Sequence, residues 1–315
     1  MPHDSFFCGT FLRTRMSLHQ TTSFSPGRRR LLTALCALPL ALTGMPTPAA
    51  GSGGVRECLA ALEAASGGRL GAAVIDMADG KSFSYRGEER FPLCSTFKVV
   101  AVGAVLQRTA TEQALLRRRI RFARQDMVPW SPVTSQHIAD GMTVEELCAA
   151  ALQQSDNTAA NLLLDLLGGP RSLTAFARSL GDDAFRLDRR EPELNASEPG
   201  DPRDTTTPEA MAATLRSLVF GPALEPAQRA VLWDWLRGNT TGAARIRAGA
   251  PAGWEVGDKT GSGHHGTAND VAVLRPPHRA PLILALYLTQ AAGDDPAREK
   301  VLAESTRTIC AAWGA

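Results

Sequence analysis

Two hydrophobic periodicities occupy separate parts of this sequence, and their separation limits the folds that it can adopt. Short β patterns occur at residues 71–76 and 81–85, and again near the other end at 270–274 and 282–288. An Asp-Gly pair between the first two is a strong hairpin turn. Because helical spacing fills the chain between these regions, we predict an α/β protein of the α+β type. Its antiparallel sheet is built from both chain ends and flanked by helices, and an all-helical lobe is inserted in the middle.

The helical periodicity divides into several segments, and the chain also ends on one. The predicted helices cover residues 95–107, 143–152, 158–167, 172–180, 208–220, 228–237 and 295–313. Thr143 and Glu146 form a capping-box pattern, and Gly168-Gly-Pro170 stops a helix. We expect an α/β lobe from residues 51–92 and 238–315, a helical lobe from 93–237, and an active site between the two.

The first fifty residues follow the order of an export signal. Arg28, Arg29 and Arg30 precede an apolar run over 31–42, and small residues come next. The run is shorter than the ~20 residues that span a bilayer, so we expect residues 1–50 to be cleaved and the domain at 51–315 to be periplasmic, without membrane contact. The arginines also fit a twin-arginine signal; ordinary secretion fits as well, and Cys36 leaves a lipoprotein as a third option.

Charge and cysteine content argue against several classes of protein. The 34 basic and 32 acidic residues give a net charge of +2, so no nucleic-acid partner is expected. The six cysteines show neither a CxxC pair nor a Cys/His cluster at metal-ligand spacing. Adjacent His264 and His265 would point in opposite directions on a strand. We therefore expect no metal and no cofactor.

Ser95 and Lys98 are the first candidate catalytic residues. Their spacing places both on one face of a predicted helix, so that the amine can lie within hydrogen-bond reach of the hydroxyl. A serine needs a neighbouring base to become a good nucleophile, and a lysine whose pKa is lowered by burial can be that base. Free N–H groups at the helix start suit a developing oxyanion. Taken alone, the pair is more often a surface Ser and Lys.

Two further motifs follow along the chain. Ser155-Asp-Asn157 lies between two predicted helices, where it could be an ordinary helix cap. Lys259-Thr-Gly261, followed by Ser262-Gly263, is predicted as an edge strand whose glycines let a ligand approach the backbone. Each motif is weak alone, but all three in this order form the motif set of the penicillin-recognising serine enzymes.

A polar loop over residues 186–207 makes the match more specific. Its segment Arg189-Arg-Glu-Pro-Glu-Leu-Asn195 resembles the omega loop of class A β-lactamases, and Asp204 is placed to pair with Arg189 across the neck of the loop. The resemblance runs from about Cys94 through Asn269. The sequence is identified as a member of the class A serine β-lactamases.

This resemblance implies a role for each motif residue. Ser95 would attack the lactam, Lys98 would take or relay its proton, Ser155 would protonate the leaving nitrogen, and Glu191 would activate the hydrolytic water. Whether Lys98 or Glu191 is the base in acylation stays open. The implied binding residues are Asn157 for the substrate's side-chain amide, Asn195 for the water, Lys259 beside Ser155, Gly261 on the edge strand, Trp130 as a wall of the cleft, and the N–H groups of Ser95 and Ser262 as the oxyanion hole.

The sequence departs from the family pattern at the carboxylate site. Many members place an arginine just after the KTG strand, where this chain has Ala268. Arg245 matches an arginine that other members use instead, and we expect it to bind the substrate carboxylate with Thr260 and Ser262. Arg247 is the competing candidate.

The cysteines also depart from known patterns. Cys148 matches a half-cystine whose partner position holds Val102, and the carbapenemase-type partner of Cys94 is replaced by Gly263. Both bridges should be absent, and carbapenem hydrolysis loses support. The expected substrates are penicillins and cephalosporins, acted on by a monomer. A penicillin-binding DD-peptidase and a β-lactam sensor, which acylate without fast turnover, are the alternatives, and Glu191 argues against both.

Overall fold

The computed structural model describes residues 52–313; the leader predicted for residues 1–50 lies outside this range. In the described part, the helices are α1 (Ser52–Ser66), α2 (Phe97–Arg108), α3 (Val144–Gln153), α4 (Asn157–Leu167), α5 (Pro170–Ser179), α6 (Pro208–Val219), α7 (Pro226–Arg237), α8 (Ile246–Gly249) and α9 (Asp295–Trp313). The strands are β1 (Arg69–Asp76), β2 (Ser82–Tyr85), β3 (Phe91–Pro92), β4 (Arg119–Ile120), β5 (Met142–Thr143), β6 (Thr205–Thr206), β7 (Glu255–Gly263), β8 (Thr267–Arg275) and β9 (Leu282–Thr289).

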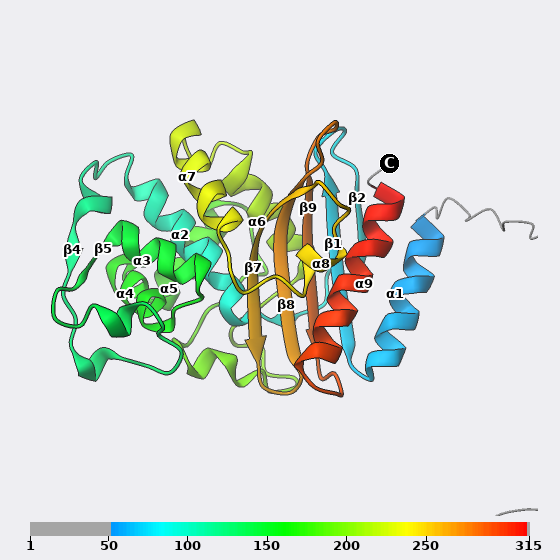
Figure 1. The fold of residues 1–315 in the computed structure, drawn as a ribbon, viewed down its shortest axis with the longest axis horizontal. Helices are drawn as coiled ribbons and strands as arrows, with labels where there is room; N and C mark the ends of the chain where they lie inside the picture. Colours follow the sequence, from blue (N-terminus) through cyan, green and yellow to red (C-terminus); the bar gives the residue numbers. More distant parts are fainter. Residues whose placement is uncertain (1–51, 314–315) are drawn as a thin grey trace, which may run out of the picture. The chain divides into compact units, whose positions relative to one another are not determined.

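The main sheet joins the two ends of the described chain, as predicted. Its strand order is β2-β1-β9-β8-β7, and every neighbouring pair is antiparallel. β1 and β2 form the predicted hairpin, and β7 is the predicted edge strand. Helices cover both faces of the sheet (Figure 1). The α+β prediction is therefore confirmed.

Alternating side chains along the sheet enter two separate cores. On β1, Leu70, Ala72 and Val74 pack toward α1 and α9, whereas Ala73 and Ile75 pack toward α6 and the rest of the helices. This alternation follows from the two-residue period of a strand. Both faces of the sheet are thus buried, which explains why its strands are almost continuously apolar.

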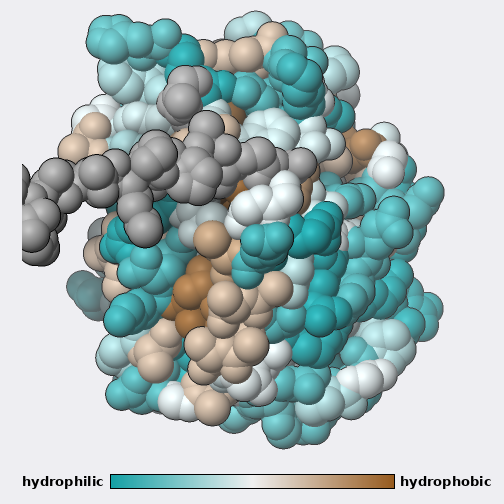
Figure 2. All heavy atoms as spheres, turned by 90° about the vertical axis from the view of Figure 1, so that its right-hand side faces the viewer, coloured by the Kyte–Doolittle hydropathy of each residue, from teal (hydrophilic) through white to brown (hydrophobic). Residues whose placement is uncertain are grey.

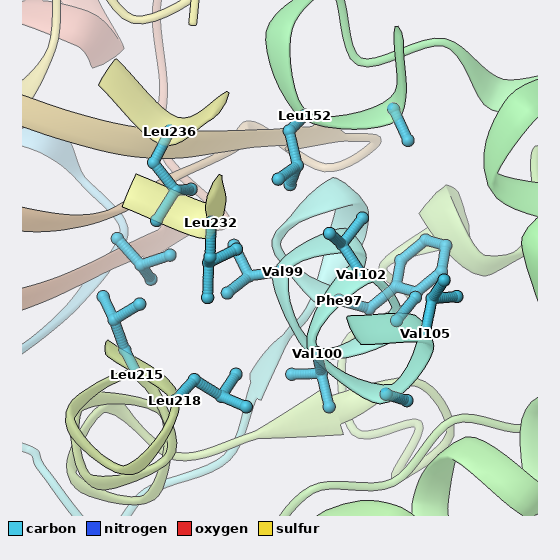
Figure 3. Close-up of a cluster of buried hydrophobic side chains, with 14 of the residues drawn as sticks. Phe97, Val99, Val100, Val102, Val105, Leu152, Leu215, Leu218, Leu232 and Leu236 are labelled. Atoms are coloured by element: carbon cyan, nitrogen blue, oxygen red, sulfur yellow. The ribbon is translucent and has the colours of Figure 1, made fainter. Parts of the chain in front are cut away.

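Helix α2 runs through the larger of these cores. Its residues from Phe97 to Leu106 are all buried, and apart from Lys98 they are apolar on every side, as expected for a helix enclosed by others. Figure 3 shows Val99 and Val100 of α2 facing leucines of α6 and α7, while Leu152 of α3 lies close to Val102. This enclosed helix fixes the position of the segment that precedes it.

The structure corrects two local predictions. Ser95 does not begin the α-helix: a 3-10 turn, η1 (Cys94–Thr96), precedes α2 at Phe97. His264 and His265 lie in the turn between β7 and β8 rather than on a strand. The boundaries of the other predicted helices agree with the structure to within a few residues, and Thr143 and Glu146 form the predicted capping box. Helix α1 and the short α8 were not among the predicted ranges.

Helices α1 and α9 form the outer layer on one side of the sheet (Figure 1). Figure 2 views this side of the molecule, which is largely hydrophilic around one apolar patch. A shallow groove of about 520 Å³ lies between the two helices and includes Leu62 and Val301 among its lining residues. None of the helices in the described range is long and apolar enough to cross a membrane.

Candidate active site

Ser95 lies in η1, between helix α2 and the edge strand β7. Its side chain is mostly buried, and the small exposed part lines a cleft of about 690 Å³. The strand approaches this turn so closely that a Cβ on Gly261 would lie 3.1 Å from the Leu93 carbonyl oxygen and 3.3 Å from the Ser95 nitrogen. Glycine therefore permits the approach of β7 to the backbone of Ser95.

Lys98 is one helical turn beyond Ser95 and is completely buried. Its Nζ donates to Asn157 Oδ1 (2.6 Å) and to the carbonyl oxygen of Ser155 (2.8 Å), and lies 3.0 Å from Glu191 Oε1. Burial lowers the pKa of Lys98, although the Glu191 carboxylate partly opposes this shift. The Ser95 hydroxyl also donates to Glu191 Oε1, at 3.0 Å. The two predicted partners are thus linked through Glu191 rather than by a direct hydrogen bond.

Ser155 lies between two buried amines. Lys259 Nζ donates to Ser155 Oγ at 3.0 Å, and Lys98 Nζ approaches the same oxygen at 3.3 Å. Burial lowers the pKa of Lys259 well below its ordinary value, and the positive charge of Lys98 lowers it further. The backbone of Ser155 has φ +57°, a conformation that side chains rarely adopt. Asp156 caps α4 by accepting from Ala159 N, as the sequence indicated.

Glu191 reaches the site from the long polar loop, where η5 (Glu193–Ala196) follows it. Asn195 Nδ2 donates to Glu191 Oε2, while Asn195 Oδ1 is buried without a partner in the described part of the protein. The Glu191–Pro192 peptide bond is cis. Asn161 of α4 holds the Glu191 backbone from both sides, donating to its carbonyl (2.9 Å) and accepting from its N–H (3.1 Å). No motif assigns a role to Asn161, although it lies within the range of the family resemblance, residues 94–269.

The neck of this loop is closed as predicted from the sequence. Arg189 Nε donates to Asp204 Oδ2 at 2.5 Å. Asp204 Oδ1 also accepts from the N–H groups of Asp188 (2.7 Å) and Arg189 (2.8 Å). The Asp204 side chain is almost fully buried, so this carboxylate ties together the two ends of the segment that carries Glu191.

The two candidate arginines have different surroundings. Arg245 Nη2 donates to Ser262 Oγ (2.8 Å), and the residue lines the cleft. Arg247 Nε donates to buried Asp258 (2.5 Å) instead, and Arg247 does not line the cleft. Glu299 of α9 lies 3.3 Å from Arg245 Nε. The structure therefore directs Arg245 toward the cleft and Arg247 into an internal ion pair.

The cleft brings the motif residues together with others that the sequence did not indicate. Trp130 is 65% exposed on its rim. Thr241 Oγ1 lies 2.5 Å from Thr260 Oγ1, which places Thr241 beside the KTG strand. Asp295, the first residue of α9, also lines the cleft. No local motif marks Thr241 or Asp295, because only chain packing brings them here. The cleft is lined by Ser95, Trp130, Ser155, Asn157, Asn195, Thr240, Thr241, Arg245, Thr260, Gly261, Ser262 and Asp295.

The remaining cysteines and histidines near the site make ordinary contacts. Cys94 and Cys148 are free thiols, and burial raises the pKa of Cys94 to about 12. His265 Nε2 lies 3.1 Å from Glu198 of the polar loop. Across residues 52–313, no three His, Cys, Asp or Glu side chains are grouped as metal ligands.

Comparison with known proteins places these residues in a family. Residues 54–313 match the profile described as the Beta-lactamase enzyme family. The chain is 52% identical to "Beta-lactamase Toho-1" of Escherichia coli over 282 residues, which is 90% of this chain and 97% of that protein. It is 50% identical to "Beta-lactamase OXY-1" of Klebsiella oxytoca over 285 residues, 90% of this chain and 98% of that protein.

Solved structures give the same result. The class A β-lactamase described as the last common ancestor of Gram-negative bacteria (GNCA4) is 60% identical, with a TM-score of 0.81 over 82% of this chain and 98% of that one.

Proposed function

The chain belongs to the class A β-lactamases, and from this membership we propose how its residues hydrolyse a β-lactam. The enzyme cleaves the β-lactam amide bond by way of a serine acyl-enzyme and confers resistance to β-lactam antibiotics. The residue roles, and penicillins and cephalosporins as its substrates, are our assignment. The observation that supports this assignment is the position of the Glu191 carboxylate. Its Oε1 contacts both the Ser95 hydroxyl and Lys98 Nζ, and its Oε2 contacts Asn195 of the same loop.

Acylation begins when Ser95 Oγ attacks the lactam carbonyl carbon. Its proton has a direct acceptor in Glu191 Oε1 at 3.0 Å, and this contact favours Glu191 as the base over Lys98. The N–H groups of Ser95 and Ser262 stabilise the oxyanion. The C–N bond then breaks, and Ser155 Oγ gives its proton to the lactam nitrogen. Lys98 and Lys259 flank that hydroxyl, and burial lowers the pKa of both amines. Lys98 restores the Ser155 proton and then takes the proton of Glu191, whose Oε1 lies 3.0 Å away, so that Glu191 is again a carboxylate before deacylation.

Deacylation uses the other side of Glu191. Its carboxylate takes a proton from a water that attacks the ester carbonyl. The ester bond to Ser95 then breaks, and Glu191 gives that proton to the leaving Ser95 Oγ, which restores both groups. Asn195 supports this step because its Oδ1 is buried, unpartnered in the described range and next to Glu191. Such an oxygen can accept a hydrogen bond from the water.

Three groups at the far end of the cleft bind the substrate carboxylate. Arg245 supplies the charge, and the hydroxyls of Thr260 and Ser262 supply hydrogen bonds. Asn157 binds the amide of the substrate side chain, and Trp130 contacts the substrate at the rim.

We assign the protein to the periplasm as a monomer, with residues 1–50 as its cleaved leader and an α/β lobe (51–92 and 238–315) facing a helical lobe (93–237). Cell fractionation and sedimentation test these two assignments.

Glu191→Gln tests the central assignment. This variant keeps the shape of the side chain but removes the base. Deacylation, which has no other base, should slow by about 10²–10⁴-fold; acylation should slow less, because buried Lys98 can still take the Ser95 proton. Incubation with a chromogenic cephalosporin should give one stoichiometric burst, and mass spectrometry should detect the acyl-enzyme on Ser95. The matched control is Glu193→Gln, two residues along the same loop, where the side chain is exposed; it should turn over at the wild-type rate.

The same measurement separates the alternatives. A wild-type protein that gives only one burst would be a penicillin-binding DD-peptidase or a sensor, and the proposed turnover would be wrong. If Glu191→Gln turns over like the wild type, the role of Glu191 is wrong while the family assignment stands.

A further inference from the structure

Asn269 lies on β8, outside the catalytic motifs, yet its side chain contacts the segment that leads into the nucleophile. It is completely buried. Its Nδ2 donates to the carbonyl oxygens of Pro92 (2.8 Å) and Leu93 (3.2 Å). These carbonyls belong to the two residues directly before Cys94 and Ser95.

The backbone at this point is strained and firmly held. Cys94 has φ +44°, in the left-handed region that side chains rarely occupy. The Leu93 carbonyl also accepts from Thr96 Oγ1 (2.7 Å), and Leu93 N donates to the Asp204 carbonyl (2.8 Å). Because the Ser95 N–H follows Cys94 immediately, restraints on Leu93 determine where this N–H points.

The backbone of Asn269 contacts the carboxylate-binding side of the cleft. Its carbonyl oxygen accepts from Arg245 Nη1 (2.9 Å), which also donates to the carbonyl of Gly261 (2.8 Å). Gly261 is the residue opposite Asn269 in the β7–β8 pair. One residue of β8 therefore contacts both the segment before Ser95 and the arginine next to Ser262.

If Asn269 served only to fill space in the core, it would make the folded state less stable than an apolar residue would. Its Oδ1 is buried and has no hydrogen-bond partner in the described range. A buried polar atom without a partner destabilises the folded state, whereas leucine would fill a similar volume without this cost. The donor group of Asn269 is what leucine could not replace.

We infer that Asn269 is a positioning residue for the oxyanion hole. By holding the carbonyls of Pro92 and Leu93 against β8, it sets the distance and direction of the Ser95 N–H relative to the Ser262 N–H. It acts without touching the substrate. The inference rests on the proposed function, because that function assigns the two N–H groups to the oxyanion.

Asn269→Leu tests this inference. The hole serves both acylation and deacylation, so kcat and kcat/KM for benzylpenicillin should each fall by about tenfold to a hundredfold, with little change in KM. A boronic acid forms a tetrahedral adduct with the serine that places an oxygen in the hole. Its inhibition constant should rise by a similar factor. Kinetics are measured at a temperature where circular dichroism shows the variant to be folded.

The matched control is Thr267→Val on the same strand. The Thr267 hydroxyl is buried and lies 2.8 Å from that of Thr289, away from residues 92–95. Its loss should lower Tm while leaving kcat and the boronate constant unchanged. Asn269→Ala is measured in parallel as the smaller side chain, so that a leucine variant that fails to fold does not remove the test.

Two results would overturn the inference. One is kcat and a boronate constant within about twofold of wild type in the folded Asn269 variants; the other is an equal loss in Thr267→Val at a similar Tm. Failure of the proposed function would look different, because the wild type would then acylate without turning over. In that case the boronic acid inhibition constants of Asn269→Leu and the wild type would still test the inference, because the boronic acid adduct forms without turnover.

Discussion

At the scale of single residues, burial determines the chemistry of the charged groups. Lys98 and Lys259 are completely buried, and burial lowers the pKa of each. An amine with a lowered pKa releases its proton near neutral pH far more readily than an exposed one. The two lysines on either side of Ser155 are therefore suited to proton transfer as well as to charge stabilisation.

Arg245→Ala should weaken the interaction of the enzyme with substrates that carry a free carboxylate. A charge-assisted hydrogen bond contributes about 1.5–3 kcal/mol, so kcat/KM for a penicillin should fall about tenfold or more. The same variant should show little loss on a penicillin whose carboxylate is esterified. Arg247→Ala is the control, since Arg247 pairs with Asp258: it should lower Tm and leave the preference for the free acid unchanged. An equal loss on acid and ester would contradict the assignment.

Asp270→Asn should change how stability depends on pH. Asp270 is buried, and burial raises its pKa well above the ordinary value, with the Asp258 carboxylate adding to the effect. The folded state keeps a proton that the unfolded chain releases above about pH 4, so this group makes stability fall as pH rises toward the folded pKa. Asparagine does not titrate, so the stability of Asp270→Asn should not fall with rising pH for this reason.

The gain in Tm of Asp270→Asn over wild type should therefore grow from pH 4 toward neutral pH, measured by thermal unfolding. Asp183→Asn, at a side chain that is 95% exposed, is the control. A Tm difference that does not vary with pH would contradict the expectation.

At the scale of elements, the site depends on how the polar loop is attached. Asp204 closes the loop through three hydrogen bonds, and Asn161 holds the backbone of Glu191 from α4. The turn after β7 adds a contact from the other side, since His264 N donates to the Asn195 carbonyl at 2.9 Å. Glu191 is placed by these attachments rather than by the short helix η5 that follows it.

Asp204→Asn should loosen this loop while preserving the shape of the side chain. Loss of the charge opposite Arg189 should cost about 1–3 kcal/mol of stability. Displacement of Glu191 should slow deacylation, so acyl-enzyme should accumulate during turnover, as detected by mass spectrometry. Glu193→Gln on the same loop, where the side chain is exposed, should have little effect on either measurement. Wild-type deacylation in Asp204→Asn would show that the neck does not position Glu191.

At the scale of the whole molecule, the described domain is stabilised by its two hydrophobic cores and contains four free cysteines. Cys58 is exposed, while Cys94, Cys148 and Cys310 are buried. Burial raises the pKa of Cys94 and of Cys310 to about 12 each. These thiols should be unreactive in the native state, because the thiolate is the reactive form.

A reducing agent should leave Tm unchanged. In native protein purified from the periplasm, Cys58 should react rapidly with a thiol reagent, and the three buried cysteines only after denaturation. Cys58→Ser should remove the rapid phase, with a native activity assay as control. A reductant-dependent fall in Tm would indicate a bridge and contradict this prediction.

The sequence by itself determined the chemical groups and most of the large elements, although it gave no range for α1. Strand and helix patterns depend on neighbours two to four positions apart, so β1, β2, β9 and α9 were predicted close to their observed bounds. The motif spacing likewise identified the serine, the lysines and the loop glutamate, and with them the family.

Only the tertiary structure decided which of these groups meet. Ser95 and Lys98 are linked through Glu191, whose position depends on a loop nearly a hundred residues away. Arg245 rather than Arg247 faces the cleft, and Asn269 contacts the segment before the nucleophile. The physical reason is that contacts between distant segments are set by how the strands pair and how the helices pack around them, and no local pattern records that geometry.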